Sequence, residues 1–370
     1  MKKILHIQVL PKMAGVQWIS YNILQNLSKK EYEKHILFSS DMDEENKLHC
    51  KKLFEGIGCK VFFFDSIKRS IGLQDFSAIK DIYNLCKREK YDIVHTNSTK
   101  PGVIGRIGAK LAKIPFIIHT VHGLSFHSFI GFPKWQFYWI CEMISSLFCD
   151  RIALVNTYYS KYFKFFNNKI LTIYNGIDFP HIEPQKINRT DTKIKILFVG
   201  RLSNQKDPMT MIKAFHLASQ KNTNLELTIV GDGEFFEDCK NLVNRYNIQT
   251  KVRFEGWQNE VTKYYKTHDI FITTSIYEAF GLVFLEAGFY KLPTIATNVE
   301  GIPEVIEDGV TGYLSNPKDI ENISENIIKL ANDKNLREKM GENAHIRVVE
   351  KFNISKMIDA YKRLYKEYPN

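Results

Sequence analysis

The sequence has few cysteines and no cysteine pattern that would build a metal site or a disulfide framework. Six cysteines occur in 370 residues, and none forms a Cys-x-x-Cys pair or a Cys/His spacing typical of zinc. Scattered single cysteines are typical of a reducing compartment. We therefore expect buried free thiols, and the pattern argues against a zinc site and against a secreted, disulfide-stabilised domain.

Long apolar runs are also missing. No stretch reaches the ~18 uninterrupted apolar residues of a membrane-spanning helix. The N-terminus resembles a signal peptide for three residues only, because His6 and Gln8 interrupt the apolar run that follows and Pro11 ends it. We expect residues 4–9 to form a buried strand and the protein to be cytoplasmic.

Positive charge is concentrated in one half of the chain. Residues 1–180 contain 25 Lys and Arg against 15 Asp and Glu, whereas residues 181–370 contain 26 of each. A basic excess confined to one half indicates an anionic partner, such as nucleic acid, an anionic membrane face or a phosphorylated substrate. The alternative that stays open is charge that serves solubility alone.

Short apolar runs alternate with amphipathic helical patterns over almost the whole chain, which predicts parallel sheets covered by helices. A polar segment at 183–192 interrupts this alternation, which then restarts. The predicted fold class is α/β, with two Rossmann-like, doubly wound domains that face a ligand cleft. The expected divisions are a domain at 1–182, a linker at 183–192, a domain at 193–351 and a final helical segment at 352–370.

The expected elements follow from this alternation. In the first half we expect strands at 4–9, 35–39, 61–64, 93–96, 116–120 and 151–155, and helices at 15–27, 45–57, 75–89 and 102–111. In the second half we expect strands at 195–199, 225–230, 252–254, 270–273 and 293–297, and helices at 208–220, 235–246, 259–266, 284–289 and 319–332.

A basic loop follows the first strand of the second half. The strand ends at Gly200, and Arg201 and Lys206 lie in the loop before a helix that begins near Asp207 and Pro208. An Arg fork and a Lys point charge together suit a diphosphate. Taken alone, the segment favours two solvated loop charges over a diphosphate site.

Two glutamates eight residues apart flank a predicted helix start. Glu278 lies in a loop after a strand, Gly281 precedes the helix, and Glu286 lies inside the helix. The main-chain amides of Gly281, Leu282 and Val283 would point from a helix N-terminus, which favours anion binding. Glu278 would accept hydroxyl hydrogens from a sugar, and Glu286 would bind a ribose diol.

Two weaker motifs stay ambiguous. The turn at 231–233, Gly-Asp-Gly, indicates either a phosphate contact or a tight strand-to-helix turn, because the full Gly-x-Gly-x-x-Gly is missing. Asp41 and Asp43 have the Asp-x-Asp spacing of some metal-dependent transferases, but neighbouring acidic residues favour a solvated loop. We therefore expect no metal and no cofactor.

Taken together, these motifs resemble family 4 of the glycosyltransferases, a retaining family with the GT-B fold. The basic loop and the Glu-x7-Glu element carry the resemblance in the second half. In the first half, the segments at 92–97, 102–106 and 118–126 are similar to the branch that acts in polysaccharide and lipid-linked oligosaccharide synthesis. The resemblance covers nearly the whole chain, and it implies that the segment at 352–370 crosses back to the first domain.

The resemblance also implies roles for single residues. Arg201 and Lys206 would neutralise the donor diphosphate, and Glu286 would hold the ribose. Glu278 and the residues that follow it would hold the donor sugar. Gly15 falls where the family has a Gly-Gly pair, although here the first position is Ala14. The donor-binding set implied in this way is Gly15, Arg201, Lys206, Phe280, Gly281, Leu282, Val283 and Glu286, with Glu278 and His122 as catalytic residues.

His122 corresponds to the family's active-site histidine, whose neutral imidazole would hydrogen-bond a sugar hydroxyl or stabilise charge in the transition state. An aromatic segment at 126–140 follows it. Phe132, Trp135 and Trp139 share one helical face there, which fits either contact with a membrane interface and a lipid-linked acceptor or packing within the domain.

The predicted reaction is transfer of a hexosyl group from a nucleotide sugar, expected to be UDP-linked, to a saccharide acceptor with retention at the anomeric carbon. The expected acceptor is linked to polyprenyl diphosphate, and the basic half is expected to meet the anionic inner membrane surface. A nucleotide-sugar epimerase of the same architecture is the alternative. A nucleic-acid binder is not expected, because no DNA or RNA motif accompanies the positive charge.

Overall fold

The computed structural model describes residues 1–368 except 69, 71, 128 and 180–192. The chain divides into two compact units. Unit 1 comprises Met1–Asn175 and Ser355–Asn370, and unit 2 comprises Gly176–Ile354. The division thus lies earlier than the expected boundary at residue 182. The predicted linker at 183–192 lies outside the described residues.

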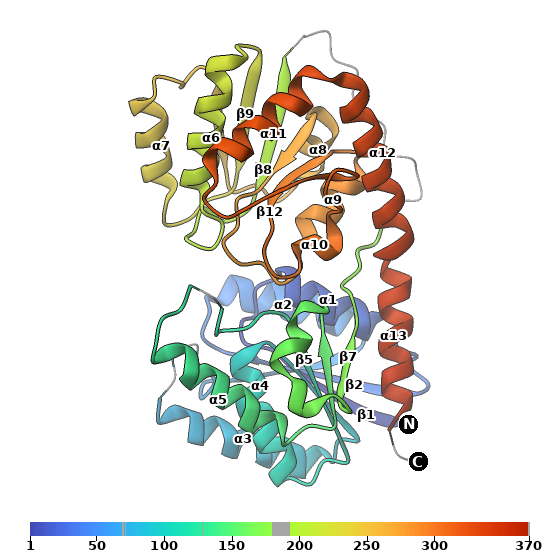
Figure 1. The fold of residues 1–370 in the computed structure, drawn as a ribbon. Helices are drawn as coiled ribbons and strands as arrows, with labels where there is room; N and C mark the ends of the chain where they lie inside the picture. Colours follow the sequence, from blue (N-terminus) through green and yellow to red (C-terminus); the bar gives the residue numbers. More distant parts are fainter. Residues whose placement is uncertain (69, 71, 128, 180–192, 369–370) are drawn as a thin grey trace. The chain divides into compact units, whose positions relative to one another are not determined.

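Unit 1 contains a parallel sheet, of which Figure 1 labels β1, β2, β5 and β7. Among the described residues its strands follow the order β3-β2-β1-β4-β5-β6-β7. The central strands are buried almost throughout, as expected for a sheet covered on both faces. The strands are β1 (Lys2–Ile7), β2 (Tyr32–Ser39), β3 (Cys59–Phe64), β4 (Ile93–Asn97), β5 (Phe116–Val121), β6 (Arg151–Leu154) and β7 (Ile170–Thr172).

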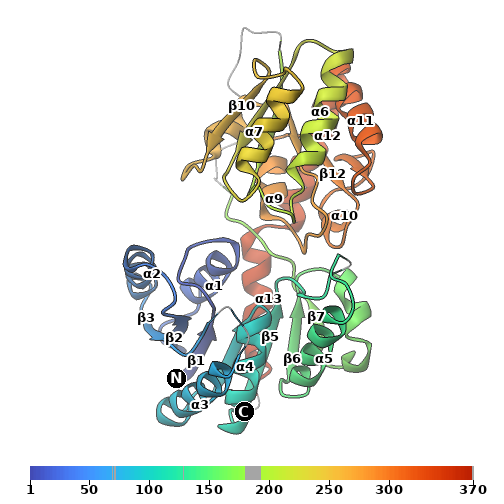
Figure 2. The same ribbon diagram turned by 90° about the vertical axis from the view of Figure 1, so that its left-hand side faces the viewer.

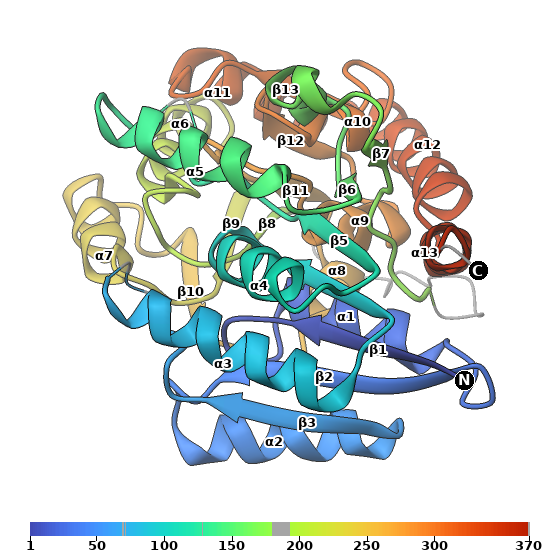
Figure 3. The ribbon, with the colours of Figure 1, turned by 90° about the horizontal axis from the view of Figure 1, so that it is seen from below.

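Helices α3, α4 and α5 lie in a row across this sheet, and α2 packs near its β3 edge (Figure 3). The helix α2 begins where the Asp43 carboxylate accepts a hydrogen bond from the amide of Asn46, so the second aspartate of the Asp41–Asp43 pair caps a helix. The helices are α1 (Gly15–Gln25), α2 (Glu44–Gly56), α3 (Gln74–Glu89), α4 (Thr99–Leu111) and α5 (Lys134–Ser146), and two short 3-10 helices, η1 and η2, cover Tyr158–Tyr162 and Lys164–Phe166.

The last helix, α13 (Ile354–Lys366), belongs to unit 1 from Ser355 onward. Its Tyr365 hydroxyl lies 2.9 Å from His6 Nε2 and 2.7 Å from His95 Nδ1. The Tyr361 hydroxyl lies 3.1 Å from Thr120 Oγ1. Both tyrosines are buried, so the end of the chain supplies polar partners to the interior of the first sheet.

Unit 2 contains a second parallel sheet, in the order β10-β9-β8-β11-β12-β13 over the described residues. Alternate residues of β8 and β9 enter a continuous apolar core beneath α6, α7 and α11. The strands are β8 (Ile194–Val199), β9 (Leu225–Val230), β10 (Val252–Gly256), β11 (Ile270–Ile272), β12 (Thr294–Thr297) and β13 (Gly312–Ser315).

Figure 2 shows α6 and α7 side by side over this sheet, and α6 also packs on α11. Aspartates cap three of the helices: Asp207 caps α6, Asp319 caps α11 and Asp333 caps α12, each by accepting a backbone amide hydrogen. The helices are α6 (Pro208–Lys221), α7 (Phe236–Arg245), α8 (Thr262–Thr267), α9 (Leu282–Phe289), α10 (Ile302–Val305), α11 (Ile320–Asn332) and α12 (Lys334–Lys351).

The predicted alternation of strands and helices is confirmed, with differences at several boundaries. The helix expected at 259–266 begins only at Thr262, and the helix expected at 102–111 begins at Thr99. Short β7 and β13, and the long α12, were not predicted. The buried face of α12 consists of Met340, Ala344 and Val348 with Gly341 and His345, so the apolar stripe in its sequence is narrow. Over the described residues, no helix is long and apolar enough to cross a bilayer.

Candidate functional site

In each sheet, the strand order reverses beside the first strand of its unit. In unit 1 the neighbours at this point are β1 and β4, and in unit 2 they are β8 and β11. Open parallel sheets bind ligands where the order reverses, outside the carboxyl ends of the strands. The predicted donor loops follow β8 and β11. In unit 1, Gly15 lies after β1, and Asn97 ends β4.

The loop after β8 is tied to the loop after β11 by hydrogen bonds to its main-chain carbonyl oxygens. The Thr274 hydroxyl lies 3.1 Å from the carbonyl oxygen of Lys206 and 2.7 Å from that of Asp207. The amide of Ile276 donates to the carbonyl oxygen of Gln205 at 2.8 Å. These bonds fix the backbone around Lys206, while Arg201, earlier in the same loop, is exposed.

Lys206 and Glu278 form an ion pair across these two loops. The Lys206 Nζ donates to Glu278 Oε2, although the residues are 72 positions apart in the sequence. Both side chains are mostly withdrawn from solvent. The contact brings together the cation predicted to bind a diphosphate and the carboxylate predicted to bind a sugar. The two predicted motifs therefore belong to one place in unit 2.

The helix α9 begins at the expected anion-binding turn. Gly281 precedes it with a φ of 82°, a left-handed conformation that favours glycine. The first amides of a helix lack partners within it, so those of Leu282 and Val283 are oriented outward from the N-terminus. The Phe280 side chain is buried, with its ring 5.4 Å from that of Phe352. The ring of Phe280 thus belongs to the packed interior of unit 2.

Glu286 lies in α9 and has a partner that the sequence did not reveal. The Tyr265 hydroxyl donates to Glu286 Oε2 at 2.7 Å. Burial raises the pKa of Glu286, and the hydrogen bond from Tyr265 opposes that rise. Tyr265 lies in α8, 21 positions earlier. The tyrosine thus stabilises the charged form of the Glu286 carboxylate.

The glycine turn at 231–233 packs against the basic loop. A Cβ on Gly231 would overlap the carbonyl oxygen of Gly200, and a Cβ on Gly233 would overlap that of Leu202. The amide of Leu202 also donates to the carbonyl oxygen of Asp232 at 2.9 Å. These two glycines therefore permit close approach of the two loops, and the tight-turn interpretation explains both of them.

In unit 1, His122 follows β5 and contacts the residue that ends β4. Its Nε2 lies 3.1 Å from Asn97 Oδ1, while Asn97 Nδ2 donates to the carbonyl oxygen of His95 at 3.4 Å. This assignment makes His122 Nε2 the hydrogen-bond donor and leaves Nδ1 as an acceptor. Burial lowers the pKa of His122 to about 3, so the ring is neutral near pH 7.

The neighbouring histidines lie in the core. His119 contacts Thr96 Oγ1 through Nδ1 at 2.9 Å, and a Cβ on Gly102 would overlap its ring. His95 lies between Tyr365 and Thr120, with both contacts at 2.7 Å. These contacts explain both histidines as parts of the interior, and His122 is the one placed beyond the strand end.

Gly15 is exposed at the first position of α1, after Ala14, which provides no side-chain cap. A pocket of about 610 Å³ lies at the carboxyl ends of β1 and β4, lined in part by Val16, Ser98, Lys100 and Tyr138. Within it, Lys100 Nζ lies 2.6 Å from Asp75 Oδ1. The pocket has a polar side near the α4 N-terminus and an apolar side on α5.

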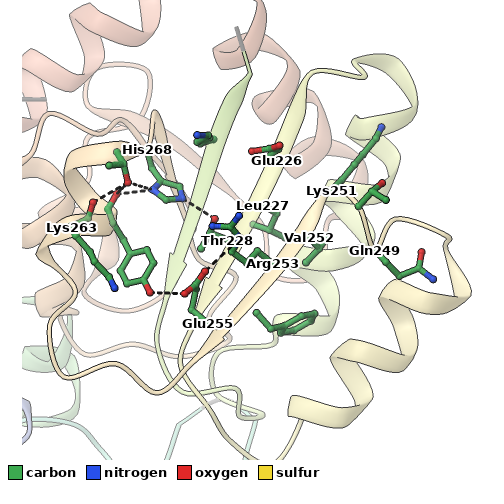
Figure 4. A pocket seen from close by; sticks show the side chains of 15 residues that line it. Glu226, Leu227, Thr228, Gln249, Lys251, Val252, Arg253, Glu255, Lys263 and His268 are labelled. Atoms are coloured by element: carbon green, nitrogen blue, oxygen red, sulfur yellow. Dashed lines mark hydrogen bonds and ion pairs between the residues drawn. The ribbon is translucent and has the colours of Figure 1, made fainter. Parts of the chain in front are cut away.

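A second hollow, of about 760 Å³, lies over β8, β9 and β10 (Figure 4). Its polar groups contact one another: Tyr264 donates to Glu255 at 2.8 Å, and His268 Nε2 lies 2.9 Å from Thr228 Oγ1. Alternate residues of these strands point to the apolar core on the other face. The hollow is thus the polar face of a sheet that the short α8 covers incompletely.

One cluster of described residues has the spacing of metal ligands, namely Glu33, His35 and Glu89. Lys3 Nζ lies 3.0 Å from a carboxylate oxygen of Glu33 and 3.3 Å from one of Glu89. The lysine therefore already occupies the place of a cation between the two carboxylates. This cluster lies at the β1–β2 side of unit 1, away from His122.

Comparisons with known proteins match both halves. Residues 13–179 match the profile described as Glycosyltransferase Family 4, and residues 181–347 match Glycosyl transferases group 1. The chain is 31% identical, over 98% of its length and 96% of the relative's, to an Escherichia coli UDP-Gal:alpha-D-GlcNAc-diphosphoundecaprenol alpha-1,3-galactosyltransferase. It is 28% identical, over 93% of its length and 92% of the relative's, to a Staphylococcus aureus capsular polysaccharide biosynthesis glycosyltransferase, CapM.

Solved structures show the same fold. Anabaena HepE in complex with UDP superposes with a TM-score of 0.81 at 19% identity, covering 99% of this chain and 100% of that one. The lipopolysaccharide outer core galactosyltransferase WaaB superposes with a TM-score of 0.75 at 18% identity, covering 99% and 100%. At this identity the likeness establishes the two-domain GT-B fold alone.

Proposed function

The chain belongs to family 4 of the GT-B glycosyltransferases, and we propose that it transfers a hexosyl group from a UDP-sugar to a lipid-linked saccharide with retention at the anomeric carbon. It is a glycosyltransferase that uses a nucleotide-sugar donor. The proposal concerns the nucleotide, the sugar class, the acceptor and the stereochemistry. The E. coli relative named for a UDP-galactose donor and the HepE complex with UDP support the choice of UDP.

The donor site rests on the contact between Lys206 and Glu278 at the β8–β11 reversal. Lys206 and Arg201 would bind the diphosphate, and the first amides of α9 would add donors. Glu278 would accept hydroxyl hydrogens of the sugar, and Glu286, held by Tyr265, would accept those of the ribose. Cations at the leaving group stabilise the charge that develops as the sugar departs.

In the proposed reaction, the bond from the anomeric carbon to the diphosphate oxygen breaks and the acceptor oxygen bonds to that carbon on the same face. The acceptor proton passes to the departing diphosphate oxygen, so no carboxylate acts as a covalent nucleophile. His122, neutral and oriented by Asn97, would bind a sugar hydroxyl through Nδ1. We propose no metal for these steps, because Arg201 and Lys206 supply the positive charge.

The acceptor proposal rests on unit 1. The E. coli relative is named for an acceptor on diphosphoundecaprenol, and that protein covers this chain almost completely. The pocket combines a polar side, which holds the ion pair of Lys100 and Asp75, with an apolar wall on α5, and this combination fits a saccharide carried on a polyprenyl chain. Such an acceptor is embedded in a bilayer, so we place the enzyme at a membrane surface.

The test measures sugar transfer from a panel of nucleotide sugars to a polyprenyl-diphosphate saccharide in detergent, with the product linkage read by NMR. Arg201→Ala should abolish the α-linked product while its thermal unfolding stays unchanged, because Arg201 is exposed. Arg245→Ala, an exposed arginine at the end of α7, is the matched control. Unchanged turnover by Arg201→Ala or a β-linked product would contradict the proposal, and an epimerised nucleotide sugar formed without acceptor would indicate an epimerase.

A further inference from the structure

The helix α5 has its polar side buried and its apolar side exposed, the reverse of an ordinary surface helix. Glu142 is 1% exposed, and Ser145 and Ser146 are also buried. Large apolar side chains occupy the outer side, and Phe132, just before the helix, is 82% exposed. The exposed apolar residues of this surface are Phe132, Phe137, Ile140, Ile144 and Leu147.

The buried polar side has a specific partner in α4. The fully buried Arg106 donates from Nη2 to Glu142 Oε1 at 2.8 Å and from Nη1 to Ser146 Oγ at 3.2 Å. A buried charge is retained only when it is paired, so this contact fixes which side of α5 faces inward. The orientation therefore follows from Arg106, and it leaves the apolar side in water.

The apolar surface continues onto the 3-10 helices. A hollow of about 520 Å³ is lined by Trp135, Trp139, Lys161, Lys164 and Phe165, among others. The two indole rings stack with centroids 6.3 Å apart, and Phe165 is 83% exposed. Indoles and lysines around one hollow suit the boundary between lipid chains and phosphate headgroups, because both side chains have an apolar body and a polar end.

The exposed charged side chains of this region are all lysines. Between residues 126 and 169, the acidic residues are Glu142 and Asp150. Glu142 is buried with Arg106, and Asp150 Oδ2 accepts the amide hydrogen of Ile117 at 2.8 Å. Lys134, Lys161 and Lys164 are all exposed. An apolar surface surrounded by cations is complementary to a surface that is apolar inside and anionic outside.

We propose that the α5 surface, defined as residues 132–147 of α5 and its approach together with 161–165, docks on an anionic lipid bilayer. Lipid phosphates would contact Lys161 and Lys164, and the apolar residues of α5 would enter the headgroup boundary. A second copy of the chain fits less well, because a two-fold contact would place these lysines against the same lysines. This inference rests on the proposed function, since a lipid-linked acceptor brings the enzyme to a bilayer.

The surface also leads to the proposed acceptor pocket. Phe137 is exposed on α5 and lines that pocket, as do its neighbours Tyr138 and Cys141. The apolar wall of the pocket is therefore continuous with the docking surface. A polyprenyl acceptor could pass its saccharide into the pocket while its chain stays in lipid.

Co-sedimentation with vesicles tests the proposal. The full-length protein should bind vesicles of phosphatidylglycerol and phosphatidylcholine at least tenfold more tightly than pure phosphatidylcholine, with binding that weakens as salt rises. The triple variant Phe132→Ser/Ile140→Ser/Ile144→Ser should lose at least tenfold in vesicle affinity. Lys161→Gln/Lys164→Gln should weaken binding to the anionic vesicles and flatten its salt dependence.

Two matched controls come from unit 1 itself. Leu73→Ser/Phe76→Ser removes exposed apolar side chains at the start of α3, and Lys51→Gln/Lys52→Gln removes exposed charge on α2. Both should bind vesicles as the unchanged protein does. Equal vesicle binding by the α5 triple variant would overturn the proposal. A concentration-dependent dimer that the triple variant abolishes, without vesicle binding by the unchanged protein, would assign the surface to a second copy instead.

Assays of the same variants separate this inference from the proposed function. With an acceptor solubilised in detergent, the triple variant should transfer sugar at the unchanged rate, because it leaves the donor loops and Phe137 intact. With the acceptor embedded in anionic vesicles, its rate should fall at least tenfold. Loss of transfer by the unchanged protein in both formats would count against the proposed function, whereas equal rates of the two proteins on vesicles would count against the docking surface alone.

Discussion

Asn97 Oδ1 lies 3.1 Å from His122 Nε2, at the ends of two neighbouring strands. Because this contact fixes the tautomer, replacing the amide by a carboxylate should change the charge of the ring. In Asn97→Asp the carboxylate would stabilise the imidazolium and raise the pKa of His122 from about 3. We expect kcat at saturating donor to decline in acid from a higher pH than in the unchanged enzyme, since protonation removes the Nδ1 acceptor.

The comparison variant is Asn97→Ala, which removes the orienting group without adding charge. It should lower kcat roughly ten- to a hundredfold, the cost of a misplaced group, and its pH profile should keep the original shape. Identical pH profiles for Asn97→Asp and the unchanged enzyme would show that Asn97 does not act through His122.

Glu278→Gln should separate nucleotide binding from transfer. The substitution removes the carboxylate that holds Lys206, so this lysine becomes more available to a diphosphate. We expect UDP to bind as tightly or a few-fold more tightly by calorimetry, while kcat falls about a hundredfold because a sugar contact is lost. Glu237→Gln, which affects only a surface pair with Lys240, serves as the control. Weaker UDP binding by Glu278→Gln would contradict this arrangement.

Tyr265→Phe should make donor binding more sensitive to acid. Burial raises the pKa of Glu286 and the Tyr265 hydroxyl lowers it, so loss of the hydroxyl raises it further. In the proposed donor site the Glu286 carboxylate accepts ribose hydroxyls, so the donor KM should increase as the pH falls. In the variant this increase should begin at higher pH. At pH 7 the donor KM should rise by roughly tenfold, the size of one hydrogen bond to a charged group.

Tyr264→Phe is the neighbouring control, because its hydroxyl donates to Glu255 in the polar hollow over β10. Its donor KM and pH profile should match those of the unchanged enzyme. A Tyr265→Phe profile that coincides with the Tyr264→Phe profile would remove Glu286 from the donor site.

Unit 1 should lose stability in mild acid. Burial lowers the pKa of His6 to about 3 and lowers those of His95 and His119 well below their usual value of 6.5. Below pH 6.5 the unfolded chain binds protons that the folded chain does not, so the free energy of unfolding should fall by up to roughly 1.4 kcal/mol per histidine per pH unit. The stability that depends on these histidines being neutral is fully present above pH 6.5.

Urea unfolding at pH 7.5 and 5.5 measures this loss. The experiment uses Trp257→Phe as the background, so that the fluorescence of the remaining tryptophans, all in unit 1, reports on that unit. His6→Gln should reduce the slope of unfolding free energy against pH, whereas His49→Gln, at an exposed position, should leave it unchanged. A free energy of unfolding that does not change between pH 7.5 and 5.5 would show that these histidines do not govern the acid sensitivity of unit 1.

Sequence patterns predicted the α/β class, the GT-B fold and the glycosyltransferase family because these depend on local periodicity and on motifs next to strand ends. They did not reveal the partners of the site residues. Tyr265 meets Glu286, and Asn97 meets His122, only through the packing of neighbouring strands and helices. The aromatic spacing of Trp135 and Trp139 predicted a shared helical face. It could not show which side of α5 is buried, because that is decided by Arg106 on another helix.

The contacts of Tyr365 with His6 and His95 have a consequence for how the protein is made. Strands β1 and β4 contain histidines whose polar partner, Tyr365, is translated only after the whole of unit 2. Unit 2 is encoded by one uninterrupted stretch between the two parts of unit 1. Its synthesis is therefore complete before that of helix α13, which belongs to unit 1. Unit 2 is thus positioned to fold before unit 1. A chain that ends before Tyr365 lacks the polar partner of His6 and His95 in the first sheet.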